Sequence, residues 1–152
     1  MIVAAHVVAG GVLGELVGDP VPAFVVGFMS HFILDAIPHY DTVDDGCYSK
    51  RQIVFTSIDF LVMFWLLFAV LKLPLDNSLW QSPLAWGALG GFFPDFVDNV
   101  PFWSKWFRAS KYGKSFHYFH DLVHKKQPSF LTGMTVQAIT IILFLLVYFD
   151  TI

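Results

Sequence analysis

The chain has 152 residues, of which 56% are hydrophobic and 14% are charged, and its formal net charge is −3. Because soluble domains carry roughly a quarter charged residues, this composition excludes an ordinary water-exposed surface. The small net charge and the lack of a basic run argue against nucleic-acid binding, and the single Cys47 excludes an intrachain disulfide and a cysteine-based zinc cage. The sequence therefore predicts a single integral-membrane domain over residues 1–152.

The expected elements are helices, because the interior of a bilayer offers backbone groups no other hydrogen-bond partners. Segments 53–71 and 129–149 are the clearest spans, since each has about the 20 apolar residues that a crossing requires. Three further helices are expected at residues 2–17, 21–36 and 83–100, which are shorter or carry charges. We expect the first to be a retained helix and not a signal peptide, because no Lys or Arg precedes it.

Residues 102–128 form an amphipathic stretch whose tryptophans, phenylalanines and lysines are typical of a helix at a membrane interface. The predicted fold is thus all-α: a polytopic membrane bundle of about five helices with an amphipathic cytoplasmic cap helix.

Cations indicate the orientation of this bundle. With five passes, the N-terminus, residues 39–52 and residues 101–128 share one side. Eight cations fall there, and only Lys72 falls on the other side: Lys50, Arg51, Lys105, Arg108, Lys111, Lys114, Lys125 and Lys126. Because loops rich in Lys and Arg usually remain on the cytoplasmic side of a membrane, this side is expected to face the cytoplasm, in a bacterial or archaeal cytoplasmic membrane.

The six histidines are expected to gather on this same side. Starts of odd helices and ends of even helices meet there, although the chain separates His6 from His124 by more than a hundred residues. Small and polar residues also recur every three or four positions, which places them on faces where membrane helices pack closely: His6, Gly10, Gly14 and Gly18; Gly27, His31 and Asp35; Gly87, Gly91, Asp95 and Asp98.

Neutral imidazole and carboxylate are ligands for Zn²⁺, Mn²⁺ or Fe²⁺. Burying a carboxylate within a membrane costs free energy unless a positive charge lies beside it. A bound metal ion would supply that charge. Each histidine alone has an ordinary interpretation as an interfacial or core residue. Their convergence nevertheless predicts two or more ions, most simply zinc, with these ligands: His6, His31, Asp35, Asp59, Asp95, His117 and His120.

Two stretches carry a family resemblance. Residues 30–41, SHFILDAIPHYD, resemble the H-F-x-x-D-x-x-P-H signature of the zinc-dependent phospholipase C and single-strand nuclease superfamily, which is helical and binds a multinuclear zinc site. Residues 87–98, GALGGFFPDFVD, with His6 and a later histidine cluster, resemble a family of bacterial inner-membrane metal-dependent hydrolases. The cluster here would be His117, His120 and His124. The resemblance implies metal-dependent hydrolysis of phosphoesters.

The leading hypothesis is therefore a membrane-embedded hydrolase that uses metal-activated water on a lipid phosphate or phospholipid headgroup. Asp98 or His124 would orient water or protonate the leaving oxygen, and Arg108 or Lys114 would hold the phosphate. Two alternatives involve no catalysis: a metal-ion carrier or sensor, and a structural protein in which the metal rigidifies the bundle. A carrier should show polar residues along a full path, and the opposite side offers only Glu15, Asp19 and Asp76.

Overall fold

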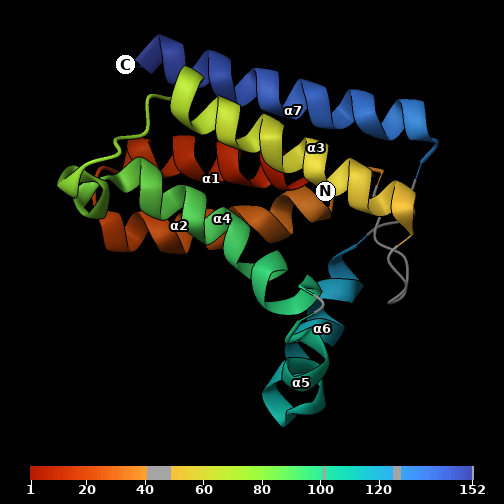
Figure 1. Cartoon of the computed structure of the whole chain (residues 1–152). Coiled ribbons are helices and arrows are strands. Elements are labelled where there is room, and N and C mark those ends of the chain that lie inside the picture. The colour runs from red at the N-terminus through yellow and green to blue at the C-terminus, as the bar shows by residue number, and fades with distance from the viewer. Residues whose placement is uncertain (41–48, 101, 125–127, 152) are drawn as a thin grey trace.

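The computed structural model describes residues 1–40, 49–100, 102–124 and 128–151, and within these ranges every regular element is helical. The all-α prediction is confirmed. Five helices lie where the sequence predicts long helices: α1 (Val3–Val17), α2 (Pro20–Asp35), α3 (Lys50–Trp65), α4 (Pro83–Asn99) and α7 (Phe130–Thr151) (Figure 1). The expected cap forms two short helices, α5 (Ser104–Ala109) and α6 (Lys111–Val123). Cys47, Lys125 and Lys126 lie outside the described residues.

Local signals explain where the helices begin and end. α1 stops at Gly18, whose left-handed backbone (φ 78°) suits glycine, and α2 starts one residue after Asp19, which caps it. Ser49 and Gln52 form a capping box at the start of α3. α3 then continues through a π-helical turn, Leu66–Val70, and a short 3₁₀ helix, Asn77–Gln81, precedes α4.

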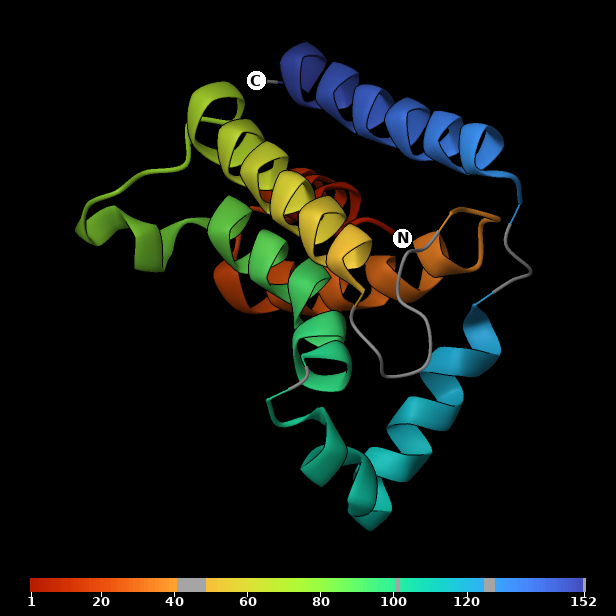
Figure 2. The ribbon, with the colours of Figure 1, turned by 45° about the vertical axis from the view of Figure 1, so that its right-hand side comes forward.

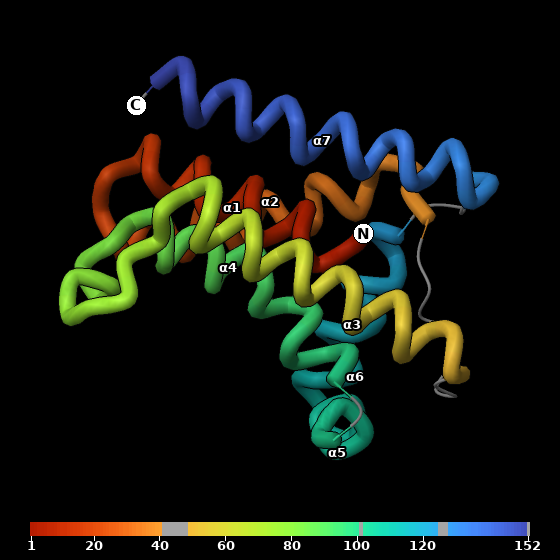
Figure 3. The backbone as a smooth tube through the Cα atoms, turned by 45° about the horizontal axis from the view of Figure 1, so that its top comes forward, coloured from red at the N-terminus to blue at the C-terminus, as the bar shows by residue number. Residues whose placement is uncertain are grey.

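The first helix, α1, is the centre of the bundle. It is buried along most of its length, and α2, α3, α4 and α7 all contact it. Successive long helices run in opposite directions, so the start of α1 lies at the same end as the C-terminal ends of α2 and α4 (Figure 1). α3 and α7 run lengthwise beside α1 (Figure 3). At that end α5 and α6 project away from the bundle (Figure 2).

Glycines bring α4 into backbone contact with both α1 and α2. A Cβ atom added at Gly87 would collide with the carbonyl oxygen of Gly10 and lie 2.8 Å from the Cα of Gly14. One added at Gly27 would collide with the carbonyl oxygen of Gly87. The predicted close packing is confirmed at these positions. Gly18 is different, because it serves as the cap of α1 and no described atom lies within 4 Å of its added Cβ.

Two helices are long and apolar enough to cross a membrane: Lys50–Val70, which joins α3 to its π turn, and Phe130–Thr151. α1 and α2 are apolar but shorter. The large side chains of the two long helices point mostly outward, as Leu61, Trp65 and Leu131 do. A core helix of a soluble protein would be mostly buried, whereas these two are mostly exposed.

Candidate metal centre

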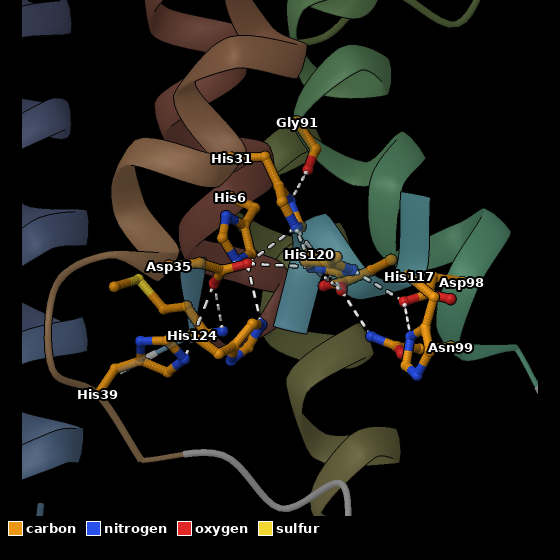
Figure 4. A network of polar contacts seen from close by, with 12 residues as sticks. His6, His31, Asp35, His39, Gly91, Asp98, Asn99, His117, His120 and His124 are labelled. Atoms are coloured by element: carbon orange, nitrogen blue, oxygen red, sulfur yellow. Dashed lines mark hydrogen bonds and ion pairs between the residues drawn. The ribbon is translucent and has the colours of Figure 1, made fainter. Parts of the chain in front are cut away.

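Polar side chains from α1, α2, α4 and α6 meet at the end of the bundle where these helices converge. His6 lies in the first turn of α1, and His31 and Asp35 lie in the last turns of α2. Asp95 and Asp98 end α4, and His120 comes from α6. His39 and His124 follow the ends of α2 and α6, and Figure 4 shows these side chains pointing toward one another.

The fully buried carboxylate of Asp35 is the centre of this cluster. Its Oδ1 lies 3.1 Å from His6 Nε2 and 2.8 Å from the amino nitrogen of Met1. Its Oδ2 lies 3.0 Å from His31 Nε2, and 3.2 Å from the Nε2 atoms of both His120 and His124. The Nε2 of His39 is 3.8 Å from Oδ1. Five imidazoles therefore surround one carboxylate.

Hydrogen bonds on the far side of two rings fix which nitrogen faces Asp35. His31 Nδ1 donates to the carbonyl oxygen of Gly91 at 2.8 Å, and His39 Nδ1 donates to that of Ile37 at 2.7 Å. A neutral ring that donates from Nδ1 presents the lone pair of Nε2. Where these rings are neutral, the lone pairs of Nε2 and of the Asp35 oxygens face each other, and a cation between them would remove their repulsion. Backbone partners of this kind commonly orient histidine ligands of metals.

The ring nitrogens of His6 show that the hydrogen bonds of the cluster are incomplete. The side chain of His6 is fully buried and stacks on the ring of His31, with centroids 3.9 Å apart. Neither ring nitrogen has a hydrogen-bond partner among the described residues, although Nε2 is close to Asp35. Because buried polar atoms are nearly always satisfied, a lone pair left without a partner at this depth is available to a metal ion.

His120 joins the cluster to Asp98. Its Nδ1 donates to Asp98 Oδ2 at 3.0 Å, while its Nε2 is 3.1 Å from His31 Nε2 and 3.7 Å from Asp95 Oδ1. Burial by itself lowers the pKa of His120, but the hydrogen bonds with Asp35 and Asp98 outweigh it and raise that pKa to about 9. A metal that takes the Nε2 lone pair must therefore displace a proton at neutral pH.

The arrangement fits a divalent metal. Among the described residues, three groups of three have ligand atoms within 4.8 Å of one another: His6, His31 and Asp95; His31, Asp35 and His120; Asp35, His39 and His124. Imidazole nitrogen and carboxylate oxygen suit Zn²⁺, Mn²⁺ and Fe²⁺. The first two groups share His31 and the last two share Asp35, so this carboxylate borders more than one possible ion position.

Five of the seven predicted ligands lie in these groups: His6, His31, Asp35, Asp95 and His120. Asp59 has other partners, because its two oxygens accept hydrogen bonds from the backbone nitrogens of Val3 and Ala4. It thereby caps the start of α1, a role in which acidic side chains are favourable. His117 lies outside the groups among the described residues, and its Nδ1 donates to Asp98 at 2.9 Å.

Two histidines from outside the predicted ligand set also belong to these groups. His124, predicted to act on water or the leaving group, lies in a ligand group with Asp35 and His39. His39 was outside the predicted ligand set. Its sequence signal was the spacing of His31, Asp35 and His39 at four-residue intervals, and it is the last histidine of the H-F-x-x-D-x-x-P-H pattern.

The predicted phosphate-binding cations differ in their surroundings. Arg108 is held at the end of α4: its Nε donates to Asp98 Oδ1 at 2.9 Å, and its Nη2 donates to the backbone oxygen of Asp98 and to Asn99. Lys114 is exposed on α6.

Comparisons with models of protein families, with curated proteins and with solved structures find no match to this chain. The family resemblance of the two motifs remains a prediction, and the case for function depends on the geometry of the cluster.

Proposed function

We propose that this chain is an integral membrane protein that binds divalent metal at the His–Asp cluster and hydrolyses a phosphoester there, with a lipid phosphate or phospholipid headgroup as substrate. The observation that carries the proposal is the buried Asp35, whose two oxygens face the Nε2 atoms of five histidines. Ligands for this metal would come from the three groups, of which the first two share His31 and the last two share Asp35.

Exposed apolar side chains support the membrane part of the proposal. Large apolar surface in a soluble monomer is rare, and lipid would cover it on Lys50–Val70 and Phe130–Thr151. We extend the proposal to five crossings, with the shorter α1, α2 and α4 packed among them. Cations of the described residues support an orientation with the cluster in the cytoplasm, since Lys50, Arg51 and Lys114 belong to the segments at its end of the bundle.

The position of the cluster supports a substrate at the membrane surface. It lies where the helices end, and the side chains of His117 and His124 are partly exposed, at 41% and 26%. Nearby, α5 and α6 expose Trp106, Tyr112 and Tyr118, aromatic residues of the type enriched at the headgroup level. A phosphate attached to lipid would therefore reach this side of the cluster without leaving the membrane.

A divalent ion in such a cluster supplies an electrophile for a phosphoryl oxygen and lowers the pKa of bound water. The protein's own contribution is to hold the ligands. His31 and His39 are oriented by backbone carbonyls, and the aromatic ring of Phe32 lies against both His31 and His120. His117, which is partly exposed and lies outside the ligand groups, would pass a proton to a leaving oxygen at the open side.

Release of phosphate from lipid substrates tests the proposal. Full-length protein in lipid vesicles should release inorganic phosphate from phosphatidic acid, or a phosphorylated headgroup from a phospholipid, when zinc or manganese is present. His31→Ala should reduce this rate to background and lower the bound metal, because His31 lies in two of the three ligand groups. Asp121→Asn, an exposed position on α6, should change neither. Full turnover and full metal content in His31→Ala would contradict the assignment.

Burial of the central residues favours one alternative, a metal that only rigidifies the bundle. His31 and Asp35 are fully buried, as a closed structural site requires. This alternative predicts bound metal, loss of thermal stability on chelation, and no release of phosphate from any ester. The vesicle assay therefore separates it from catalysis.

A further inference from the structure

Asp98 is almost fully buried beside the cluster, and among the described residues it belongs to none of the three ligand groups. Its Oδ2 accepts hydrogen bonds from the Nδ1 atoms of His120, at 3.0 Å, and His117, at 2.9 Å. Its Oδ1 accepts one from Arg108 Nε at 2.9 Å. Figure 4 shows Asp98 on the side of the His120 ring that faces away from Asp35.

The two nitrogens of the His120 ring therefore have different partners. Nδ1 donates a hydrogen bond to Asp98, and Nε2 faces Asp35, Asp95 and His31. A carboxylate on the outer nitrogen of a histidine fixes the tautomer, orients the ring and raises its basicity toward a metal. His31 and His39 use backbone carbonyls for the same purpose, so Asp98 is the charged member of this set.

Arg108 in turn holds Asp98. Its guanidinium donates to the carboxylate and to the backbone oxygen of Asp98, and also to Asn99 Oδ1 at 3.1 Å. Because these bonds join α5 to the last turn of α4, they fix the carboxylate in position. The three side chains form a chain of contacts from Arg108 through Asp98 to His120.

We propose that Asp98 is a positioning residue for the metal centre, which orients His120 so that Nε2 faces the ion, and that Arg108 holds Asp98 in place. This inference builds on the proposed metal site. It assigns Asp98 and Arg108 to the support of a ligand, in place of the proton transfer and phosphate binding that the sequence suggested for them.

Metal affinity of the full chain tests this proposal. Zn²⁺ affinity is measured in detergent by competition with a chromogenic chelator, and Co²⁺ absorption reports on ligand geometry. Asp98→Asn keeps the shape of the side chain but removes its charge, and it should weaken Zn²⁺ binding about 10–100-fold. The stoichiometry at saturating metal should stay the same, and the visible Co²⁺ bands should shift because His120 is no longer held. Arg108→Gln should cause a smaller loss in the same direction.

Two controls separate this role from a general loss of structure. Asp121→Asn removes a carboxylate from the exposed side of α6 and should leave affinity and Co²⁺ bands unchanged. Thermal unfolding without metal shows whether each variant is folded, and Arg108→Gln, at a half-exposed side chain, provides the test by itself if Asp98→Asn does not fold. Wild-type affinity in folded Asp98→Asn or Arg108→Gln would overturn the positioning role. Absence of metal binding in the wild type would instead overturn the proposed function.

Discussion

Asp35→Asn should lose metal more completely than any other single substitution in the cluster. Its two oxygens border the nitrogens of five histidines, so removing the charge affects every ion position that the ligand groups allow. The affinity loss should exceed the roughly 10–100-fold effect of a partner outside the metal's ligand shell. Metal content of the purified variant, measured by elemental analysis, checks this result.

Asp59→Asn is the matched control. Asp59 is also partly buried in a helix near the same end of the bundle, but its oxygens accept hydrogen bonds from the start of α1. Asn can still accept one of these bonds, so the variant should keep its metal and lose stability by about 0.5–2 kcal/mol. Equal metal content in the Asp35 and Asp59 variants would contradict the central place of Asp35.

Gly87→Ala should destabilise the bundle strongly. The added methyl group would collide with the backbone of Gly10 on α1, and backbone atoms cannot move aside as a flexible side chain can. The expected loss is at the upper end of about 1–3 kcal/mol, as for overpacked cores. Because α4 also carries Asp95 and Asp98, its displacement should weaken metal binding as well.

Gly11→Ala is the control for this prediction. Gly11 lies on α1 next to the affected face, but an added Cβ would be 3.4 Å from the nearest atom, the carbonyl oxygen of Leu84. The substitution should therefore be tolerated, with a gain in helix propensity of up to about 1 kcal/mol. Thermal unfolding of both variants, followed by circular dichroism in detergent, gives the comparison. Equal midpoints would show that the contact between α4 and α1 tolerates a side chain.

The positions of the helices were predictable because the signals are local. Apolar runs, Gly18, Pro20 and Ser82 mark the ends of segments that the structure forms within a few residues of the expected bounds. The meeting of His6, His31 and Asp95 was also predictable, since alternating helices return to the same end. Length and composition support a membrane-spanning role for α7 and for α3 together with its π turn, whereas α1, α2 and α4 are shorter than these two spans.

Roles within the cluster were less predictable, because they depend on which atoms face each other. The sequence places Asp59 early in a helix at the correct end, but the helix start that it caps lies more than fifty residues away. Likewise, no local sequence signal distinguishes Asp98 from Asp95. Asp98 accepts a hydrogen bond from the outer nitrogen of His120, whereas Asp95 lies near its Nε2 on the side of the ligand groups. His39 needed the turn at Ala36 and Ile37, directly after α2, to bring its ring back to Asp35.

The most direct test of the central claim is metal analysis of the wild-type protein, purified in detergent without added metal. We predict at least one bound equivalent of zinc, manganese or iron. X-ray absorption should then show nitrogen and oxygen ligands near roughly 2.0–2.2 Å, with the outer scattering of several imidazoles and no sulfur. A protein that holds no metal, and that gains no thermal stability when any of these ions is added, would contradict the account. The cluster would then be a buried hydrogen-bonded network of histidines around Asp35.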